Sequence, residues 1–525
     1  MGNEHSVNKN LKLIAKSSLI VFIGIAVSKI LVYIYRVIIA RQFGPDMYGI
    51  FSLASMAISW FAAFFAFGLN EGIVRYISIF RGTKNEKKIR YVFRISSAIM
   101  IVSSIVGGIL LFLLSDFISL QIFHNQELAI FLKAFSILVP LTILSGAYLS
   151  LIRAYEMVGW QSFIFNIAQN VVKVSVLILL VVMGMRSSSP IIISYMLGIF
   201  IMFVMSYLVA RYKIPGVFAE NKIAGKMPAK NKILTELIHY SYPIMFTGIF
   251  SIIFYWLDSF AIGYFRNVTE VGYYNAAVPI AMLLLLAPEL FTQLFFPIIA
   301  KEYSKKNYST IKELSKQVGK WIFIINLPIF ILIILFPGAL INILFGKEYL
   351  VAAQALRILS VGALVSSIFI ISQNIISMIG KSRMLLYNIL ITTAINLALN
   401  VILVPALGIN GAALSASLSF ILLNAMIILE AKHYAGIIPL RRKMLKILLV
   451  SLIPVALLIL AKNFILLNLF TMILLGIFFI VIYAFLMLAT GCLDRNDAMI
   501  IETFKKYFAK RGMMPQNSLN NKQVS

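Results

Sequence analysis

The chain has 525 residues, of which 61% are hydrophobic and only 12% charged, and its mean hydropathy is +0.95. Soluble proteins carry about 25% charged residues, so this composition excludes a soluble enzyme or a disordered scaffold and indicates a helical protein that crosses a membrane many times. Lys and Arg number 46 against 19 Asp and Glu, but they lie in short segments between apolar stretches, where they set membrane topology rather than bind nucleic acid.

Fourteen apolar stretches are long enough to cross a bilayer, which takes about 20 residues. In chain order they cover 17–40, 47–69, 91–114, 129–152, 163–184, 190–210, 239–263, 271–299, 321–343, 351–379, 384–404, 410–431, 446–461 and 464–490. No small-residue cleavage site follows the first stretch, so we expect it to remain as a helix. We therefore predict an all-α membrane protein with 14 transmembrane helices.

The basic residues predict the orientation of these helices. If the N-terminus is cytoplasmic, the segments after even-numbered helices hold most of the Lys and Arg residues, with clusters over 75–94, 211–232 and 432–446. The opposite side holds only Arg41, Arg186, Arg266, Lys347 and Lys462. Because cytoplasmic loops are enriched in Lys and Arg, we predict a multi-pass protein of the cell (inner or cytoplasmic) membrane with both termini in the cytoplasm.

The two halves of the chain match each other at a nearly constant offset of about 222 residues. The matching pairs are Tyr33 and Tyr255, Arg36 and Asp258, Phe43 and Phe265, Gly49 and Gly272, Phe123 and Phe345, Met157 and Met378, Gly159 and Gly380, and Asn166 and Asn388. Parallel repeats of this kind are a transporter layout with a site between two lobes. The predicted units are an N-terminal lobe over 1–210, a cytoplasmic linker over 211–238, a C-terminal lobe of six helices over 239–435, two additional helices within 436–490 and a cytoplasmic tail over 491–525.

Charged side chains within the predicted helices are the first candidates for a functional site, because a charge near the bilayer centre costs on the order of 3 kcal/mol or more. Lys29, Tyr33 and Arg36 are spaced four and three residues apart, which places them on one helix face. That face presents two cations and a phenol to an anion. The alternative is that the cationic heads reach the membrane surface, which suits Arg36 near the outer end better than Lys29 at mid-helix.

Two further residues extend this candidate headgroup cavity. Asp258 is the repeat mate of Arg36, so we expect the two to face each other, either as a bridge that parts when a diphosphate arrives or as a permanent lock between the lobes. Lys173 follows Asn166 by seven residues and so shares its helix face. Lys173 is therefore a candidate for headgroup binding.

Four other charged residues are candidates for coupling or gating. Glu71 and Arg75 are four residues apart at the inner end of the second helix and form an ordinary surface pair, unless Glu71 faces inward. Glu289 follows Pro288 in an apolar run, where it either carries a proton during transport or is bonded to a carbonyl that the proline leaves unpaired. Arg357 lies near the outer end of the tenth helix, where reaching for the surface is the favoured alternative.

Other pairs and signals are weaker. Arg153 and Glu156 are expected to form a cytoplasmic gate pair or nothing more. The single cysteine, Cys492, excludes a disulfide framework, and the four histidines lack metal-ligand spacing. We therefore expect no metal, no cofactor and no catalytic residue.

Several stretches resemble the oligosaccharide (polysaccharide) flippases of the multidrug/oligosaccharidyl-lipid/polysaccharide exporter superfamily. They are ARQFGP over 40–45, YGIFSL over 48–53, FGL over 67–69, DSFAIGYF over 258–265, VGYY over 271–274, LFGKEY over 344–349, ALRIL over 355–359 and GINGAA over 408–413. The resemblance implies two lobes around a central cavity. It also implies that a polyprenyl-(di)phosphate-linked oligosaccharide moves from the cytoplasmic to the external face by alternating access, for assembly of cell-surface polysaccharide or glycoprotein glycans. The implied partners are this lipid-linked oligosaccharide and membrane lipids, with a glycan polymerase or transferase as a further candidate.

Three alternatives remain open at this point. A membrane glycosyltransferase or oligosaccharide ligase would be an enzyme with a large external domain, whereas the longest predicted outer segment covers only 115–128 and holds two acids, Asp116 and Glu127. A cation-coupled drug exporter of the same superfamily would have an acidic rather than a basic cavity. A lipid II flippase of peptidoglycan synthesis fits the helix count and the basic cavity equally well, and only the motif pattern favours the polysaccharide branch.

Overall fold

A computed structural model describes residues 2–219, 230–305, 307–462 and 468–493, and all regular structure in these ranges is helical. The helices are α1 (Gly2–Phe65), α2 (Leu69–Gly82), α3 (Glu86–Asp116), η1 (Phe117–Ile122), α4 (Gln126–Ser136), α5 (Leu138–Ala154), α6 (Val158–Ser162), η2 (Phe163–Ala168), α7 (Gln169–Val182), α8 (Ser189–Lys213), α9 (Pro215–Phe218), α10 (Lys230–Phe265), α11 (Val268–Ala281), η3 (Met282–Leu285), α12 (Leu286–Ser304), α13 (Tyr308–Leu335), α14 (Pro337–Leu344), η4 (Lys347–Ala352), α15 (Ala353–Met378), α16 (Ser382–Leu407), α17 (Ile409–Ala435), α18 (Arg442–Lys462) and α19 (Leu469–Ala489). Part of the predicted linker (220–229) and most of the predicted tail (494–525) lie outside the described residues.

The described residues include 12 helices that are long and apolar enough to cross a membrane, or 13 when the bent pair α4 and α5 is taken as one span. The chain is thus a multi-pass helical membrane protein, as predicted, but the count of fourteen is not confirmed. The remaining difference lies in α1, which covers the first two predicted spans as one helix of 64 residues.

A sharp turn divides α1 into two arms. Gly44 has φ 80° and ψ 177°, a backbone conformation that glycine adopts more readily than other residues, and Pro45 follows it. The rings of Tyr35 and Phe51 lie 5.7 Å apart, although sixteen residues of continuous helix would separate them by about 24 Å. The chain therefore reverses at Gly44, and we refer to residues 2–43 as the first arm of α1 and to 45–65 as the second arm.

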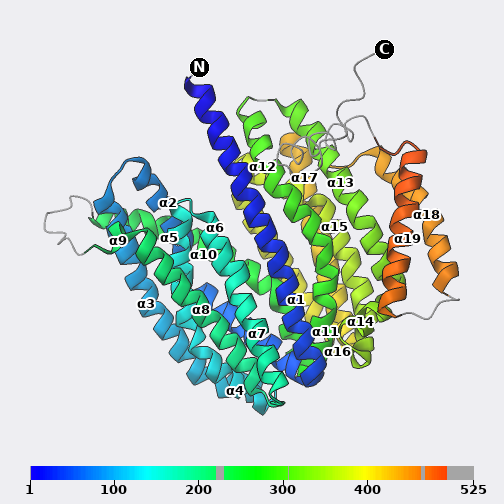
Figure 1. Ribbon diagram of the computed structural model, residues 1–525, viewed down its shortest axis with the longest axis horizontal. Helices are drawn as coiled ribbons and strands as arrows, with labels where there is room; N and C mark the ends of the chain where they lie inside the picture. The colour runs from blue at the N-terminus through cyan, green and yellow to red at the C-terminus, as the bar shows by residue number, and fades with distance from the viewer. Residues whose placement is uncertain (1, 220–229, 306, 463–467, 494–525) are drawn as a thin grey trace.

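Figure 1 shows the helices in two groups that lie close together at one end and diverge toward the other. Helices α2 to α9 form one group, α11 to α17 form the other, and the first arm of α1 runs between them. The pair α18 and α19 packs on the outer side of the second group, where Phe479 and Tyr483 join a buried cluster with Phe323 and Leu327 of α13. Helix α1 begins and α19 ends at the same end of the molecule.

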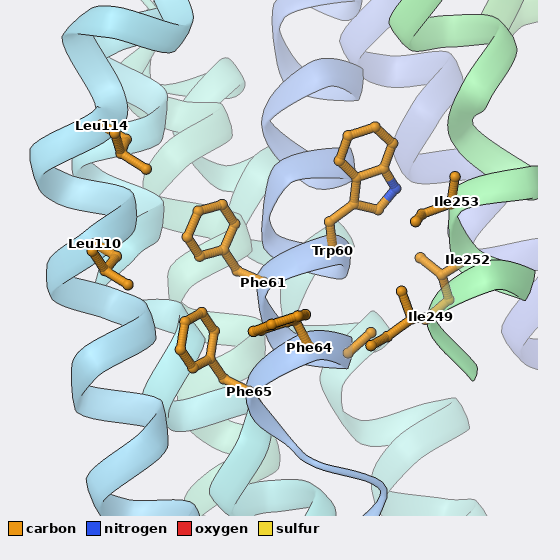
Figure 2. Close-up of a pocket in the computed structure, with 10 residues that line it drawn as sticks. Trp60, Phe61, Phe64, Phe65, Leu110, Leu114, Ile249, Ile252 and Ile253 are labelled. Carbon is orange, nitrogen blue, oxygen red and sulfur yellow. The ribbon is translucent and has the colours of Figure 1, made fainter. Parts of the chain in front are cut away.

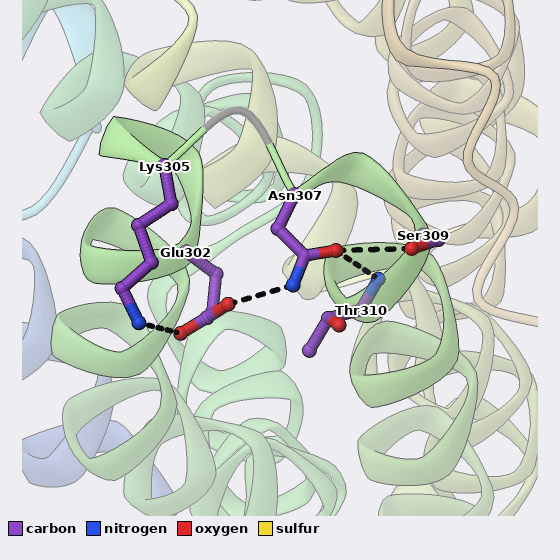
Figure 3. Close-up of polar contacts among 5 residues, drawn as sticks. All are labelled: Glu302, Lys305, Asn307, Ser309 and Thr310. Atoms are coloured by element: carbon purple, nitrogen blue, oxygen red, sulfur yellow. Dashed lines mark hydrogen bonds and ion pairs between the residues drawn. The ribbon is translucent and has the colours of Figure 1, made fainter.

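The connection between α12 and α13 illustrates how helix ends at that same side are held (Figure 3). The Asn307 side-chain oxygen accepts hydrogen bonds from the Thr310 backbone N–H (3.3 Å) and the Ser309 hydroxyl (3.0 Å). Its amide nitrogen donates to Glu302 at 3.0 Å, and Lys305 donates to the same carboxylate at 3.1 Å. Asn307 thus caps α13 in the usual way and ties it to α12.

Candidate substrate cavity

A cavity of ≈ 550 Å³ lies between the first arm of α1 and the segment of α11, η3 and α12 from Pro279 to Leu286. Lys29, Tyr33 and Arg36 all line it, because their spacing places them on one face of the first arm. The structure therefore brings these three predicted residues together. We call this space the charged cavity; apart from Lys29, Arg36 and the phenols of Tyr33 and Tyr255, its described lining is apolar.

Lys29 pairs with an acidic residue of α12, Glu289, at the edge of the charged cavity. Its Nζ lies 3.9 Å from Oε2 of Glu289, and the two side chains are 57% and 39% exposed. Of the two roles considered for Glu289, bonding to a carbonyl freed by Pro288 does not account for this placement. Because exposed ion pairs of this length contribute at most about 1 kcal/mol, a stronger anion can displace Glu289 from Lys29.

Arg36 lies deeper, near the phenols of Tyr48, Tyr195 and Tyr255. No carboxylate of the described residues forms an ion pair with it. The Tyr33 hydroxyl, one turn away, is buried and has no hydrogen-bond partner among the described residues. A buried polar group without a partner is costly, so a ligand with acceptor oxygens would be stabilised here. Tyr33 was predicted from the sequence, but Tyr48, Tyr195 and Tyr255 were not. Of these, Tyr255 could have been found as the repeat mate of Tyr33.

Asp258 does not face Arg36, which corrects the predicted bridge. Its carboxylate accepts hydrogen bonds from Asn400 at 2.9 Å, from Asn396 at 3.2 Å and from the Tyr274 hydroxyl at 3.2 Å. Asn396 and Asn400 are one helical turn apart on α16 and so present both amides to the same carboxylate. Asp258 is 7% exposed and is held among the helices of the second group, so the predicted bridge or lock with Arg36 is not formed.

Lys173 also lies apart from the charged cavity. It is 8% exposed on α7, its Nζ is 4.1 Å from the centre of the Tyr195 ring, and Gln169 accepts a hydrogen bond from it at 3.4 Å. Lys173 is thus stabilised by an aromatic face and an amide and is not among the residues that line the cavity. Its link to the site is indirect, through Tyr195, which also lies near Arg36.

The predicted gating residues have other partners than expected. Glu71 pairs with Arg153 at 2.6 Å, so neither the Glu71 pair with Arg75 nor the Arg153 pair with Glu156 is formed. The Arg75 guanidinium instead stacks on the Tyr240 ring at 4.2 Å, which connects α2 to α10. None of these residues lines the charged cavity.

Arg357 is a helix-end residue in the structure. Its Nε donates to the Ile334 carbonyl at 3.1 Å and its Nη1 to Gln354 at 3.3 Å. The last carbonyls of α13 lack partners within their own helix, and a cation is favourable there. This position accounts for Arg357 without a gating role, and it does not line the charged cavity.

The two groups of helices lie close together at one end of the molecule, which we call the narrow end. This end is closed by contacts that the sequence did not reveal. Arg41 donates to three successive carbonyls at the end of α14, those of Asn342 (3.3 Å), Ile343 and Leu344 (2.8 Å). The Tyr349 hydroxyl donates to the Ala40 carbonyl at 3.1 Å. Sequence reasoning assigned Arg41 only to the outer side, because backbone carbonyls leave no residue signature. Since the Leu344 side chain lines the charged cavity, these contacts close that cavity at this end.

The second arm of α1 crosses α11 in direct backbone contact. A Cβ atom added at Gly49 would lie 1.8 Å from the Val268 carbonyl oxygen, and one added at Gly272 would lie 2.1 Å from that of Pro45. Gly49 and Gly272 are repeat mates, and Pro45 and Val268 correspond at the same offset of 223 residues. The crossing is therefore reciprocal, with each half of the chain making the same contact to the other.

The comparisons with known proteins agree with this architecture. Residues 14–303 match a family described as polysaccharide biosynthesis protein, and residues 243–402 match the MatE family. The chain is 25% identical over 403 residues to an uncharacterized membrane protein of Methanocaldococcus jannaschii, covering 74% of this chain and 78% of that protein. It is 24% identical over 392 residues to a putative O-antigen transporter of Shigella flexneri, covering 73% and 89%.

A solved structure of a lipid II flippase in an inward closed conformation has the same fold. The TM-score is 0.69 with 18% sequence identity, and the match covers 89% of this chain and 98% of that one. At this identity the likeness concerns the fold alone.

Proposed function

Because the chain belongs to the polysaccharide biosynthesis protein family of the multidrug/oligosaccharidyl-lipid/polysaccharide exporter superfamily, we propose that it flips a polyprenyl-(di)phosphate-linked oligosaccharide from the cytoplasmic to the external face of the cell membrane. It is a membrane transporter of the flippase class and not an enzyme. The observation that carries the proposal is the pairing of Lys29 and Arg36 on one wall of an otherwise mostly apolar cavity.

The residues of this wall suit a phosphate-linked headgroup. A guanidinium binds phosphate oxygens through a planar fork of donors, and an ammonium binds them as a point charge. The unpaired Tyr33 hydroxyl adds a third donor between them. We infer that the incoming phosphate replaces Glu289 as the partner of Lys29, so that the empty site is not left with an unpaired cation and the loaded site gains a stronger one.

Release on the opposite side requires the narrow end to open. With both termini in the cytoplasm, as the basic loops predict, the narrow end closed by Arg41 is the external one. Opening it breaks the Arg41 and Tyr349 contacts and lets the headgroup leave. An anion that moves outward through a negative-inside potential gains about 2.3 kcal/mol per charge and 100 mV, which assists the step without ATP.

The test is a flipping assay in proteoliposomes with a fluorescent polyprenyl-diphosphate sugar. Wild type is compared with Lys29→Ala, Arg36→Ala and the control Arg357→Ala, which removes a half-buried cation outside the cavity. The proposal predicts that the first two variants lose flipping while folded and that the control retains it. Undiminished flipping by both cavity variants would contradict the site.

Competition in the same vesicles distinguishes polysaccharide flipping from lipid II flipping and drug export. An excess of unlabelled polyprenyl-diphosphate oligosaccharide should inhibit the signal more strongly than lipid II, which carries a peptide on its sugar. Stronger inhibition by lipid II would assign the chain to peptidoglycan synthesis, and inhibition only by cationic drugs would assign it to drug export.

A further inference from the structure

A second hollow, of ≈ 320 Å³, lies between the second arm of α1, α3 and α10 (Figure 2). Phe61 and Phe65 extend toward the leucines of α3, whereas Trp60 extends toward the isoleucines of α10. The other lining residues are Ala63, Phe64, Leu110, Leu114, Ile249, Ile252 and Ile253. None of the described residues that line it is charged. We call this hollow the aromatic crevice.

The aromatic crevice is the counterpart of the charged cavity in the internal repeat. Ile30, Met282, Leu283 and Leu286 line the charged cavity, and their mates at an offset of 222 line the aromatic crevice. Those mates are Ile252, Trp60, Phe61 and Phe64. The duplication thus produced two equivalent spaces, of which one holds Lys29 and Arg36 while the other has no charged residue in its described lining.

Two neighbouring hollows extend the aromatic crevice along the second arm. One of ≈ 530 Å³ shares Phe65 with it, and one of ≈ 120 Å³ shares Trp60 and Phe61. Together they follow the arm from Leu53 to Phe65, a length of about 18 Å at the rise of an α-helix. The hydrocarbon core of a bilayer is about 30 Å thick. The three hollows therefore follow a long apolar stretch of the arm, which matches a single linear chain better than a compact molecule.

The two spaces share α10 as a wall. Tyr255 faces the charged cavity, and Ile252 and Ile253, less than one turn away, face the aromatic crevice. A helix with its side chains is about 10 Å across. A molecule with a charged head in one space and its hydrocarbon chain in the other therefore has to pass beside α10, over a distance that a long chain can span.

We propose that the aromatic crevice and its two neighbouring hollows bind the polyprenyl chain of the substrate while its phosphate occupies the charged cavity. This inference rests on the proposed function. The indole N–H of Trp60 is buried without a hydrogen-bond partner among the described residues. A polyprenyl chain has a double bond in every isoprene unit, and an N–H group forms a weak contact with π electrons. A saturated acyl chain offers no such partner.

A photocrosslinking experiment tests the occupant directly. The photoreactive residue p-benzoylphenylalanine replaces Ile249 in the crevice or, as a control, Leu113, which is 67% exposed on α3 and does not line it. Each protein is placed in phosphatidylethanolamine and phosphatidylglycerol vesicles that contain tritiated polyprenyl monophosphate without any sugar. We expect about tenfold more label at position 249 than at 113. Unlabelled polyprenyl phosphate should compete, and a saturated alkyl phosphate should not.

Equal labelling at the two positions, or equal competition by the saturated phosphate, would overturn the proposal and show that the crevice holds ordinary membrane lipid. A second pair of variants controls for the effect of a folding defect on labelling. Leu110→Trp fills the crevice and should abolish capture at position 249, whereas Leu113→Trp on the same helix should not. Capture that survives Leu110→Trp in folded protein would likewise overturn the proposal.

The two proposals fail in different ways. A soluble sugar diphosphate without a polyprenyl chain reports on the charged cavity alone, and its binding should depend on Lys29 and Arg36 but not on Leu110. If this binding is absent while polyprenyl capture persists, the headgroup site is wrong and the crevice stands. If binding is present and capture is absent, the flippase site stands and the crevice is wrong.

Discussion

Lys29 Nζ and Glu289 Oε2 lie 3.9 Å apart, and Lys29 lines the charged cavity. This pair joins the first arm of α1 to α12 in the middle of an apolar span. Both side chains are partly exposed, so the contact is open to exchange. If Glu289 occupies the place of the substrate phosphate in the empty protein, it competes with the headgroup for Lys29.

Removing that competition should tighten binding. We expect Glu289→Gln to lower the Kd for a soluble sugar diphosphate by up to about fivefold, since an exposed pair is worth at most about 1 kcal/mol. Isothermal titration calorimetry in detergent measures this, with Glu127→Gln at an exposed outer position as the control. An unchanged or higher Kd would show that Glu289 does not compete for Lys29.

Asp258 should matter for stability and not for headgroup binding. Asn396 and Asn400 both donate to Oδ1, and Tyr274 donates to Oδ2, so an amide at this position loses the negative charge that all three bonds favour and turns its amino group toward the Tyr274 hydroxyl. We expect Asp258→Asn to destabilise the fold by about 1–3 kcal/mol, seen as a lower Tm in detergent. The Kd for the soluble sugar diphosphate should stay unchanged. A large change in that Kd would restore the predicted coupling between Asp258 and Arg36.

Lys173 is a buried cation that should not matter for headgroup binding. Lys173→Met keeps the volume of the side chain and removes its charge, and we expect binding of the soluble sugar diphosphate to be unaffected, because Lys173 does not line the charged cavity. Titration of the variant next to Lys29→Met makes the comparison. Equal losses of affinity in both variants would place Lys173 in the headgroup site after all.

Arg41 should control access from the narrow end. Arg41→Ala removes donors to three carbonyls of α14, and hydrogen bonds of this kind contribute about 0.5–1.5 kcal/mol each. We expect the cavity to open more often on that side, by at least about one order of magnitude.

The rate at which an impermeant maleimide modifies a cysteine placed at Leu344 measures this opening, in a protein whose native Cys492 is replaced by Ser. Arg186→Ala, which removes another predicted outer arginine that is exposed and not near α14, is the matched control. A rate for Arg41→Ala equal to that of the control would show that the three contacts do not hold this end closed.

The sequence predicted part of the cavity because helix periodicity is local. Lys29, Tyr33 and Arg36 share a wall since their spacing alone decides their common face. Hydropathy likewise revealed a multi-pass helical protein. The break between the predicted spans 17–40 and 47–69 also contains the turn at Gly44. The same reasoning could not reveal the partners of Glu289 and Arg75, because these depend on how distant helices pack.

The failed bridge between Arg36 and Asp258 has a geometric cause. Residues related by a twofold repeat lie at equivalent places in the two halves, and they touch only where they lie on the axis that relates the halves. Gly49 and Gly272 meet in this way. Arg36 and Asp258 lie away from the axis and contact different residues. Opposite charge at matched positions is therefore no sign of contact.

The crossing of the second arm with α11 also limits which genetic changes the protein can tolerate. A larger residue at Gly49 would strike the Val268 backbone, and one at Gly272 would strike that of Pro45. Such a clash is usually relieved by a smaller side chain at the facing position, but here the facing atoms belong to the backbone, which no substitution removes. A damaging substitution at either position thus has no second-site suppressor at the other, and the two codons are constrained together although the chain places them more than 200 residues apart.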